Sequence, residues 1–284
     1  MPESPEVQAL VDFLSARVVG QVVRSVDIVL PKALKDGDPA ALAGCRITAV
    51  VRRGKLIDLV AGDPDGTTVA VAYDLIVHWG HDGWVVWHDV VPDGLRRSGD
   101  ATLMARIRLD DGSGFDLTDS GQWKALSIFI VPSPAAVPAV AKLGPDPTDP
   151  EFSRDQLRAI VSGRRKQLKA LLQDQGAIGG IGNAYSDEIL HAAKLSPVVH
   201  ASSLTEEDTD RLYDAMRSIL TSATRARSGL PPELLKDDKR ANMRVHRRPG
   251  QACPVCGDVV REITFSGAAA HYCATCHTGG VILA

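Results

Sequence analysis

The chain has 284 residues, of which 44% are hydrophobic and 24% are charged, a balance that is typical of globular proteins and excludes global disorder. At roughly 100–200 residues per domain, this length predicts two domains and a small appendage. The formal net charge of −3 argues weakly against a nucleic-acid partner, but residues 225–248 contain eight Lys or Arg against three acids. A polyanionic partner is compatible with such a basic segment.

From the sequence we expect neither a membrane span nor a secretory signal. Its apolar runs are interrupted by Asp or His well before the roughly 18 residues of a transmembrane helix. The segment Met1–Glu6 carries two acids and no basic residue. We therefore expect no membrane partner and a cytoplasmic location, at the nucleoid if DNA is the partner.

In the first half of the chain, one predicted helix precedes a series of strands. Apolar residues recur at helical spacing over residues 5–19. Segments rich in Val, Ile and Thr then follow, separated by Gly, Asp and Pro. The predicted strands are Val22–Leu30, Arg46–Arg52, Leu56–Ala61, Thr67–Trp79, Trp84–Val90, Ala101–Leu109 and Phe115–Thr118. Short strands at this spacing indicate an antiparallel sandwich or barrel.

The second half is predicted to be helical. Six prolines between residues 132 and 150 indicate a semi-rigid linker. Beyond it, Ser153 can cap a helix that runs to about residue 162, and Lys166–Gln173 continues the helical pattern. Ala184–Ala193 follows as a short helix. Thr205 begins a capping-box pattern with Asp208, so a long helix is expected to run to about Arg227.

These features divide the chain into four parts. We expect an N-terminal β-sandwich domain, a linker, a helical domain, and a Cys-rich tail that follows a basic Pro/Gly loop. The predicted boundaries are 1–131, 132–150, 151–244 and 245–284.

The tail carries the strongest local motif. Cys253 and Cys256 form one CxxC pair, Cys273 and Cys276 form another, and 16 residues separate the pairs. Without a secretory signal, this spacing indicates metal binding rather than disulfides. Four thiolates complete a tetrahedral zinc site and leave no open position, so we expect one structural zinc ion, with a β-hairpin between the pairs. Two histidines that flank the second pair are alternative ligands: His271 and His277.

A glycine-rich turn, Gly179–Asn183, leads directly into a predicted helix. Glycines let a ligand approach the backbone, and N–H groups at a helix start attract phosphate. The alternative is a plain tight turn between two helices. No Gly-Lys-Ser/Thr follows, so the turn is not a Walker loop.

The N-terminus can carry amine chemistry. We expect processing to remove Met1 because Pro2 is small. Pro2 would then present a secondary amine, and a secondary amine that attacks an aldehyde-level carbon gives an iminium, which is a strong electron sink. Glu3, one residue away, could serve as general acid or base. The alternative is an ordinary chain start without chemistry.

Four motifs together resemble one family. They are Pro2–Val7, Arg53-Gly54-Lys55, the pair Leu171–Gln175 and Gly180–Leu190, and the Cys-rich tail. In this order they resemble the N-terminal motif, the turn with an essential lysine, the helix–two-turn–helix element and the zinc finger of the formamidopyrimidine-DNA glycosylase and endonuclease VIII family.

The resemblance implies a fold and an activity. The fold is α+β and multidomain: an N-terminal β-sandwich with an N-terminal helix, a helical helix–two-turn–helix domain and a C-terminal zinc finger. The activity is that of a bifunctional DNA glycosylase/AP lyase of base-excision repair, which removes an oxidised or otherwise damaged base. The expected partner is damaged double-stranded DNA, and we expect a monomer.

The resemblance also implies residue roles. Pro2 would attack the sugar C1′ of the damaged nucleotide, and Glu3 would protonate the opening deoxyribose ring. Lys55, counted with the catalytic residues, would contact the phosphate beside the flipped nucleotide. Asn183, with Gly182 in the same turn, would also contact DNA phosphate.

The resemblance also implies that two loops and the zinc finger contact DNA when a base is flipped. His81 occupies the position of a residue inserted into the vacated stack; the alternative is an ordinary surface histidine. The family usually shows Asp-Pro-Arg-Arg-Phe-Gly where this chain has residues 119–124, so a wedge arginine is missing, although Trp123 could stack on a base. Ala268 stands where the zinc finger normally carries a phosphate-clamping arginine, for which Arg247 or Arg248 could compensate.

Two other function classes remain open. The first is a non-catalytic binder of damaged or abasic DNA, and the second is a zinc-ribbon protein that binds RNA or protein. The intact Pro2, Glu3 and Lys55 argue against both, because a pure binder has no chemical need for an N-terminal proline.

Overall fold

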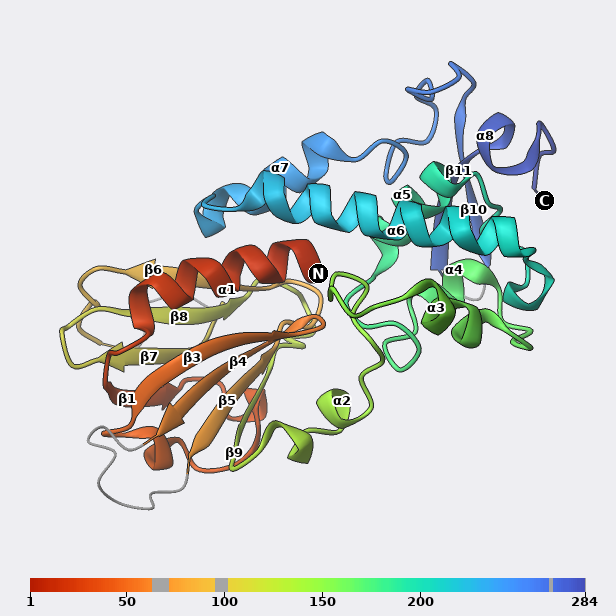
Figure 1. Ribbon diagram of the computed structural model, residues 1–284. Coiled ribbons are helices and arrows are strands. Elements are labelled where there is room, and N and C mark those ends of the chain that lie inside the picture. Colours follow the sequence, from red (N-terminus) through yellow and green to blue (C-terminus); the bar gives the residue numbers. More distant parts are fainter. Residues whose placement is uncertain (63–71, 95–101, 266–267, 284) are drawn as a thin grey trace. The chain divides into compact units, whose positions relative to one another are not determined.

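The computed structural model describes residues 1–62, 72–94, 102–265 and 268–283 (Figure 1). The chain divides into two compact units. The sandwich unit comprises Met1–Pro2, Glu6–Lys142 and Ser228–Leu235, and the helical unit comprises Glu3–Pro5, Leu143–Arg227 and Lys236–Ala284. No helix in the described ranges has the length and apolar character that crossing a bilayer requires.

Two separate sheets form the sandwich unit, which confirms the predicted sandwich rather than a barrel. One sheet has four strands in the order β1-β7-β8-β6, and the other has five in the order β2-β9-β5-β4-β3. The strands are β1 (Val23–Ile28), β2 (Leu34–Asp36), β3 (Arg46–Arg53), β4 (Leu56–Gly62), β5 (Tyr73–His78), β6 (Gly83–His88), β7 (Leu103–Leu109), β8 (Gly114–Asp119) and β9 (Ser127–Val131). Neighbouring strands pair antiparallel, except for the parallel pair β2–β9.

Helix α1 (Ser4–Val18) closes the core of the sandwich unit. The apolar residues that recur at helical spacing are almost completely buried together with residues of both sheets, as predicted: Val7, Leu10, Val11, Leu14 and Val18. Burial of each large apolar side chain stabilises the folded state by roughly 1.5–3 kcal/mol. The predicted strands Thr67–Trp79 and Ala101–Leu109 begin outside the described residues, and their described parts form β5 and β7.

The helical unit contains the predicted helices as α3 (Arg154–Val161), α4 (Leu168–Leu172), α5 (Asn183–Ala193) and α6 (Glu206–Arg227). Ser153 caps α3 in a full capping box with Gln156. Thr205 and Asp208 exchange reciprocal side-chain-to-backbone hydrogen bonds at the start of α6, as predicted. These helices bury a second apolar core, separate from that of the sandwich unit.

Two segments differ from their predictions. The proline-rich stretch contains a 3-10 turn at Pro134–Ala136 and the short helix α2 (Pro138–Ala141). The stretch after α6 was expected to be a loop, but it holds helix α7 (Pro232–Asn242), which begins with proline at a position where no N–H is needed. The loop prediction was therefore wrong for these residues.

The tail folds as predicted around a hairpin. Strands β10 (Val260–Phe265) and β11 (Ala268–Cys273) pair antiparallel, and the short helix α8 (Ala274–Thr278) follows. The clamping arginine was expected to be missing at Ala268. Only the backbone of Ala268 is described, and the preceding residue, Gly267, lies outside the described residues.

Candidate active site and nucleic-acid interface

The carboxylate of Glu3 fills the N-terminus of helix α5. It accepts hydrogen bonds from the backbone N–H groups of Gly182 (2.5 Å), Ala184 (3.0 Å) and Tyr185 (3.2 Å). The first turn of a helix leaves N–H groups without helical partners, and its dipole favours negative charge. Glu3, the predicted proton-transfer residue, thus lies beside Asn183, although the two are 180 positions apart in the sequence.

The same contact explains the glycine at position 182. A Cβ atom there would lie 2.6 Å from the carboxyl carbon of Glu3, so only glycine leaves room for the carboxylate. The Gly182 N–H, which we expected to be available to phosphate, donates to Glu3 instead. The DNA contact of Gly182 stays a prediction, and this hydrogen bond disfavours a contact through its N–H.

Lys239 on α7 joins this group, and sequence reasoning missed it. Its Nζ lies 3.4 Å from Glu3 Oε1 and 4.8 Å from the centre of the Tyr185 ring. The side chain of Lys239 is largely buried, so its charge acts on Glu3 with little screening by water. The sequence signal that could have revealed Lys239 is Pro232, which favours the start of a helix. A helix from Pro232 would have predicted that the charged residues after it, Lys239 among them, have fixed positions.

The side chain of Asn183 is exposed at the first position of α5. Its Oδ1 accepts from Gln173 Nε2 at 3.1 Å. Its backbone carbonyl accepts from Ser186 Oγ at 3.0 Å and from Lys169 Nζ at 3.4 Å. Both polar oxygens of Asn183 are therefore held from inside the protein.

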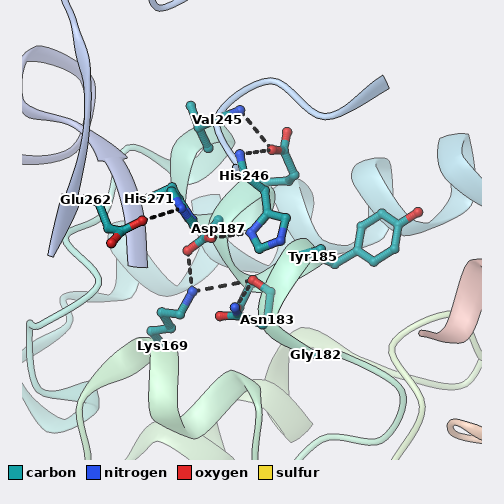
Figure 2. Close-up of polar contacts among 12 residues, drawn as sticks. Lys169, Gly182, Asn183, Tyr185, Asp187, Val245, His246, Glu262 and His271 are labelled. Carbon is teal, nitrogen blue, oxygen red and sulfur yellow. Dashed lines mark hydrogen bonds and ion pairs between the residues drawn. The ribbon is translucent and has the colours of Figure 1, made fainter. Parts of the chain in front are cut away.

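Behind Asn183 lies a buried charge cluster centred on Asp187 (Figure 2). One carboxylate oxygen pairs with Lys169 Nζ, and the other accepts from His246 Nδ1 (2.7 Å) and His271 Nδ1 (3.1 Å). His271 Nε2 lies 3.0 Å from Glu262. Burial by itself raises the pKa of Asp187, but the hydrogen bonds from the two histidines and the charge of Lys169 lower it to about 2.

The ligand atoms of Asp187, His246 and His271 lie within 4.8 Å of one another, as in a metal site. However, the ammonium group of Lys169 pairs with the same carboxylate and would repel a cation there. We therefore assign the cluster as a hydrogen-bond network. It joins four segments of the helical unit: α4, α5, the chain after α7, and the β10–β11 hairpin.

Glu188 fixes the chain that carries His246. Its carboxylate accepts hydrogen bonds from the backbone N–H groups of Arg244, Val245 and His246, each at 2.9 Å. The neighbouring Arg247 is exposed and adopts φ +58°, a left-handed conformation that is rare outside glycine. Arg248 binds the carbonyl of Ala241 near the end of α7.

The four cysteines of the tail fit a tetrahedral metal. Their sulfur atoms all lie within 4.8 Å of one another, with 3.8 Å between Cys253 and Cys276 and 3.3 Å between Cys256 and Cys273. Zinc–sulfur bonds of about 2.3 Å in a tetrahedron place sulfurs about 3.8 Å apart. Burial raises the pKa of Cys273 to about 11, so a dication is what would stabilise the thiolates.

Neither alternative ligand belongs to this group. Both ring nitrogens of His271 lie within hydrogen-bond distance of carboxylates, those of Asp187 and Glu262. His277 Nδ1 lies 3.0 Å from both the backbone nitrogen and the carbonyl oxygen of Cys273. The structure instead places His191 of α5 beside the site, with Nε2 3.2 Å from Cys253 Sγ.

In the sandwich unit, Lys55 lies in the two-residue turn between β3 and β4. Gly54 at the first turn position has φ +60°, as a tight hairpin of this kind requires. Lys55 is largely buried. The pKa of His78 is lowered mainly by the burial of His78 and next by the charge of Lys55. Pro2 belongs to this unit by its contacts and is buried.

The loops that carry His81 and Trp123 lie side by side in the same unit. A Cβ on Gly80 would come within 2.7 Å of Ala125, so the close approach of the loops depends on glycine. Buried Asp119 holds the second loop by accepting from the N–H groups of Gly121 and Leu126. His81 is exposed, and Trp123 is 81% exposed.

Comparison with known proteins gives the same organisation. The family model of the formamidopyrimidine-DNA glycosylase N-terminal domain matches residues 1–124, and that of the H2TH domain matches residues 143–230. An uncharacterized formamidopyrimidine-DNA glycosylase-like protein of Mycobacterium tuberculosis is 46% identical over 53% of this chain and 94% of its own. The formamidopyrimidine-DNA glycosylase of Heliobacterium modesticaldum is 32% identical over 97% of this chain and 99% of its own.

The fold agrees. The crystal structure of Lactococcus lactis Fpg (MutM) with DNA containing N7-benzyl-Fapy-dG matches with a TM-score of 0.84 at 25% identity, over 98% of this chain and 100% of that chain. Fold and sequence thus indicate one class of protein, the DNA glycosylases that combine an N-terminal sandwich with an H2TH domain. The chain belongs to the formamidopyrimidine-DNA glycosylase family.

Proposed function

We propose that this protein is a bifunctional DNA glycosylase/AP lyase that removes a damaged base through an iminium at Pro2. The observation that carries the proposal is the contact of Glu3 with the start of α5. It places the residue that follows the nucleophile beside Asn183, the expected phosphate contact. The carboxylate directly follows Pro2 in the sequence, so a proton-transfer group lies next to the candidate amine.

The glycosylase step would use both N-terminal residues. The nitrogen of Pro2 attacks C1′, and the bond from C1′ to the base breaks, so the base leaves with its electron pair and takes a proton from solvent. The carboxylate of Glu3 accepts the proton of the alkylated amine and delivers it to O4′ as the C1′–O4′ bond opens. The three N–H donors and Lys239 hold the carboxyl group of Glu3 in one orientation for this transfer.

The lyase step follows from the iminium. The cation on Pro2 draws electrons from C1′, so the C2′ proton becomes acidic. Loss of that proton to solvent leaves its electron pair to form the C2′–C3′ double bond, the C3′–O bond breaks, and the 3′ phosphate leaves with the electron pair of that bond. Water then hydrolyses the iminium and releases the enzyme. No step requires a redox partner.

Other residues would hold the flipped substrate. We assign phosphate contacts to Lys55 and Asn183, because one offers an ammonium group and the other an exposed amide. Base flipping costs roughly a few kcal/mol. His81 would occupy the vacated position in the base stack and Trp123 would stack on a base, and both contacts would offset this cost. The substrate is damaged double-stranded DNA, which places the protein at the nucleoid.

The cysteine cluster would hold one zinc ion that stabilises the β10–β11 hairpin. Zinc is the metal that four thiolates in a tetrahedron suit best, and it leaves no site open for chemistry. The residues that would hold it are Cys253, Cys256, Cys273 and Cys276.

Borohydride trapping tests the proposal. Protein with Met1 removed is incubated with a duplex containing an abasic site, reduced, and mapped by peptide mass spectrometry. We expect a covalent adduct at Pro2 rather than at Lys55. Protein that retains Met1 is the matched control and should give none, because its proline nitrogen is an amide. If the processed protein binds the duplex but yields no adduct, the protein is a non-catalytic binder of abasic DNA.

A further inference from the structure

Gln173, which directly follows α4, contacts the candidate phosphate residue. Its Nε2 donates to Asn183 Oδ1 at 3.1 Å and to Ser186 Oγ at 3.2 Å. No sequence motif singled out this glutamine. Its contacts lie within the helical unit and join the end of α4 to the first turn of α5.

The hydrogen atoms in this group fix which way each amide points. Ser186 has one hydroxyl proton, and it donates to the carbonyl of Asn183 at 3.0 Å. Ser186 Oγ must therefore accept from Gln173, so Gln173 presents its NH2 group on this side. An NH2 group needs an acceptor, so Asn183 must present Oδ1 to Gln173.

The consequence is that Asn183 Nδ2 points away from Gln173. Within the described part of the chain, Nδ2 of this exposed residue has no hydrogen-bond partner. An amide NH2 carries two donors, and a phosphate oxygen is an acceptor without a proton to offer. Turned by 180°, the same side chain would present its oxygen to the phosphate and repel it.

We propose that Gln173 is a positioning residue that holds the Asn183 amide with its NH2 group toward a DNA phosphate. The inference deepens the proposed function and rests on the phosphate contact of Asn183. Gln173 touches no substrate atom itself. It acts by removing the inverted orientation of Asn183 before DNA arrives, so that binding does not have to select one of two orientations.

A second glutamine holds Gln173 in place. Gln175 Nε2 donates to the carbonyls of Gln173 (2.9 Å) and Ile181 (2.7 Å), and its Oε1 accepts from the N–H of Gly180 (2.9 Å). The end of α4 and the glycine-rich turn before α5 are thus tied through one side chain. The distance between Gln173 and Asn183 is fixed by backbone as well as by side-chain contacts.

A double-mutant cycle tests the proposal. The probe is a duplex with a tetrahydrofuran abasic analogue, which cannot form an iminium, and the measurement is the dissociation constant by fluorescence anisotropy. Asn183→Ala should weaken binding about tenfold, as expected for a hydrogen bond to a charged group. Gln173→Met, similar in size but without hydrogen bonds, should weaken it about threefold. Gln167→Met at the other end of α4, where the side chain makes no capping bond, is the control and should change nothing.

Gln173→Glu gives the sharper result. A carboxylate only accepts, so it would pull Asn183 Nδ2 inward and turn its oxygen outward. We expect a loss larger than that of Gln173→Met, about tenfold or more. Part of this loss could come from charge repulsion with DNA. Repulsion weakens as salt rises and persists in the Asn183→Ala background, whereas the orientation effect disappears in that background.

The outcomes separate the two claims. If Asn183→Ala leaves affinity unchanged, the phosphate contact fails and this inference fails with it. If Asn183→Ala weakens binding but Gln173→Met does so by the same factor in both backgrounds, the contact stands and Gln173 acts through packing instead. If the effect of Gln173→Met falls below twofold in the Asn183→Ala background, Gln173 acts through Asn183, as proposed.

Discussion

Replacing Asp187 by Asn should strongly destabilise the helical unit. The substitution keeps the shape of the side chain but removes the negative charge between Lys169, His246 and His271. Lys169 and Asp187 are each only 1% exposed, so the ammonium group would be left buried without its counter-ion. Breaking a buried ion pair in this way typically costs about 3–5 kcal/mol.

The pKa of Asp187 reflects the whole network around the carboxylate, in which the hydrogen bonds from His246 and His271 lower the pKa before the charge of Lys169 does. The pKa of Asp187 falls from its ordinary value of 3.8 to about 2 in the folded protein. At about 1.4 kcal/mol per pH unit, this difference corresponds to roughly 2–3 kcal/mol. Because the folded pKa is depressed, the contribution is complete above pH 3.8 and is lost as the pH falls toward 2. We therefore expect a loss of about 3 kcal/mol in Asp187→Asn at pH 7.

Urea unfolding of both proteins between pH 7 and pH 2.5 measures this difference. The gap in unfolding free energy should be constant down to about pH 4 and should narrow below it. Any bound zinc is released from both proteins in acid, so the two are compared with each other at each pH. Asp155→Asn is the matched control, because its partner Arg158 and its own side chain are both exposed, and it should change stability by about 0.5 kcal/mol or less. A gap below 1 kcal/mol at pH 7, or one that does not narrow in acid, would refute the reasoning.

Three further predictions concern other parts of the molecule. Burial, helped by the neighbouring carboxylate of Asp58, raises the pKa of Asp74 to about 6, so the folded state holds a proton that the unfolded state has lost. Stability should therefore fall as pH rises from 4 toward 6 and above, and Asp74→Asn should flatten this profile in thermal unfolding. Trp123→Ala should weaken binding of an abasic-analogue duplex about tenfold with an unchanged melting temperature, since the ring is 81% exposed. Elemental analysis should find one zinc per chain, and Cys253→Ser should lose it and expose the hairpin to proteolysis; zinc-free protein with an intact hairpin would contradict this.

The sequence predicted elements whose pattern is local. Alternating apolar residues and Gly/Asp turns were enough to predict most strands of the sandwich unit. Strand β9 was missed because Ser127–Val131 lies between two other strands of its sheet and carries apolar residues in an unbroken run, which has no period of two. Helix α7 was missed because six of its eleven residues are charged, so its sequence suggested a basic loop.

The candidate site was predictable only in part. CxxC spacing predicted the cysteine cluster because the ligands come in close pairs. The contact of Glu3 with α5 could not be predicted, because it joins residues 179 to 182 positions apart and depends on which N–H groups the fold leaves open. The Asp187 cluster was missed for the same reason: it gathers side chains from four segments, and no spacing in the sequence predicts that these side chains meet.

The placement of Glu3 has a consequence for dissecting the protein. Residues 3–5 belong to the helical unit, although the chain on either side of them, Met1–Pro2 and the segment from Glu6, belongs to the sandwich unit. A fragment that began at Leu143 would contain α5 but not the carboxylate that its first N–H groups require. Such a fragment would need an external anion, or the N-terminal peptide supplied in trans, to complete that helix. Cutting the chain at residue 143 therefore separates Glu3 from the helix start that it contacts.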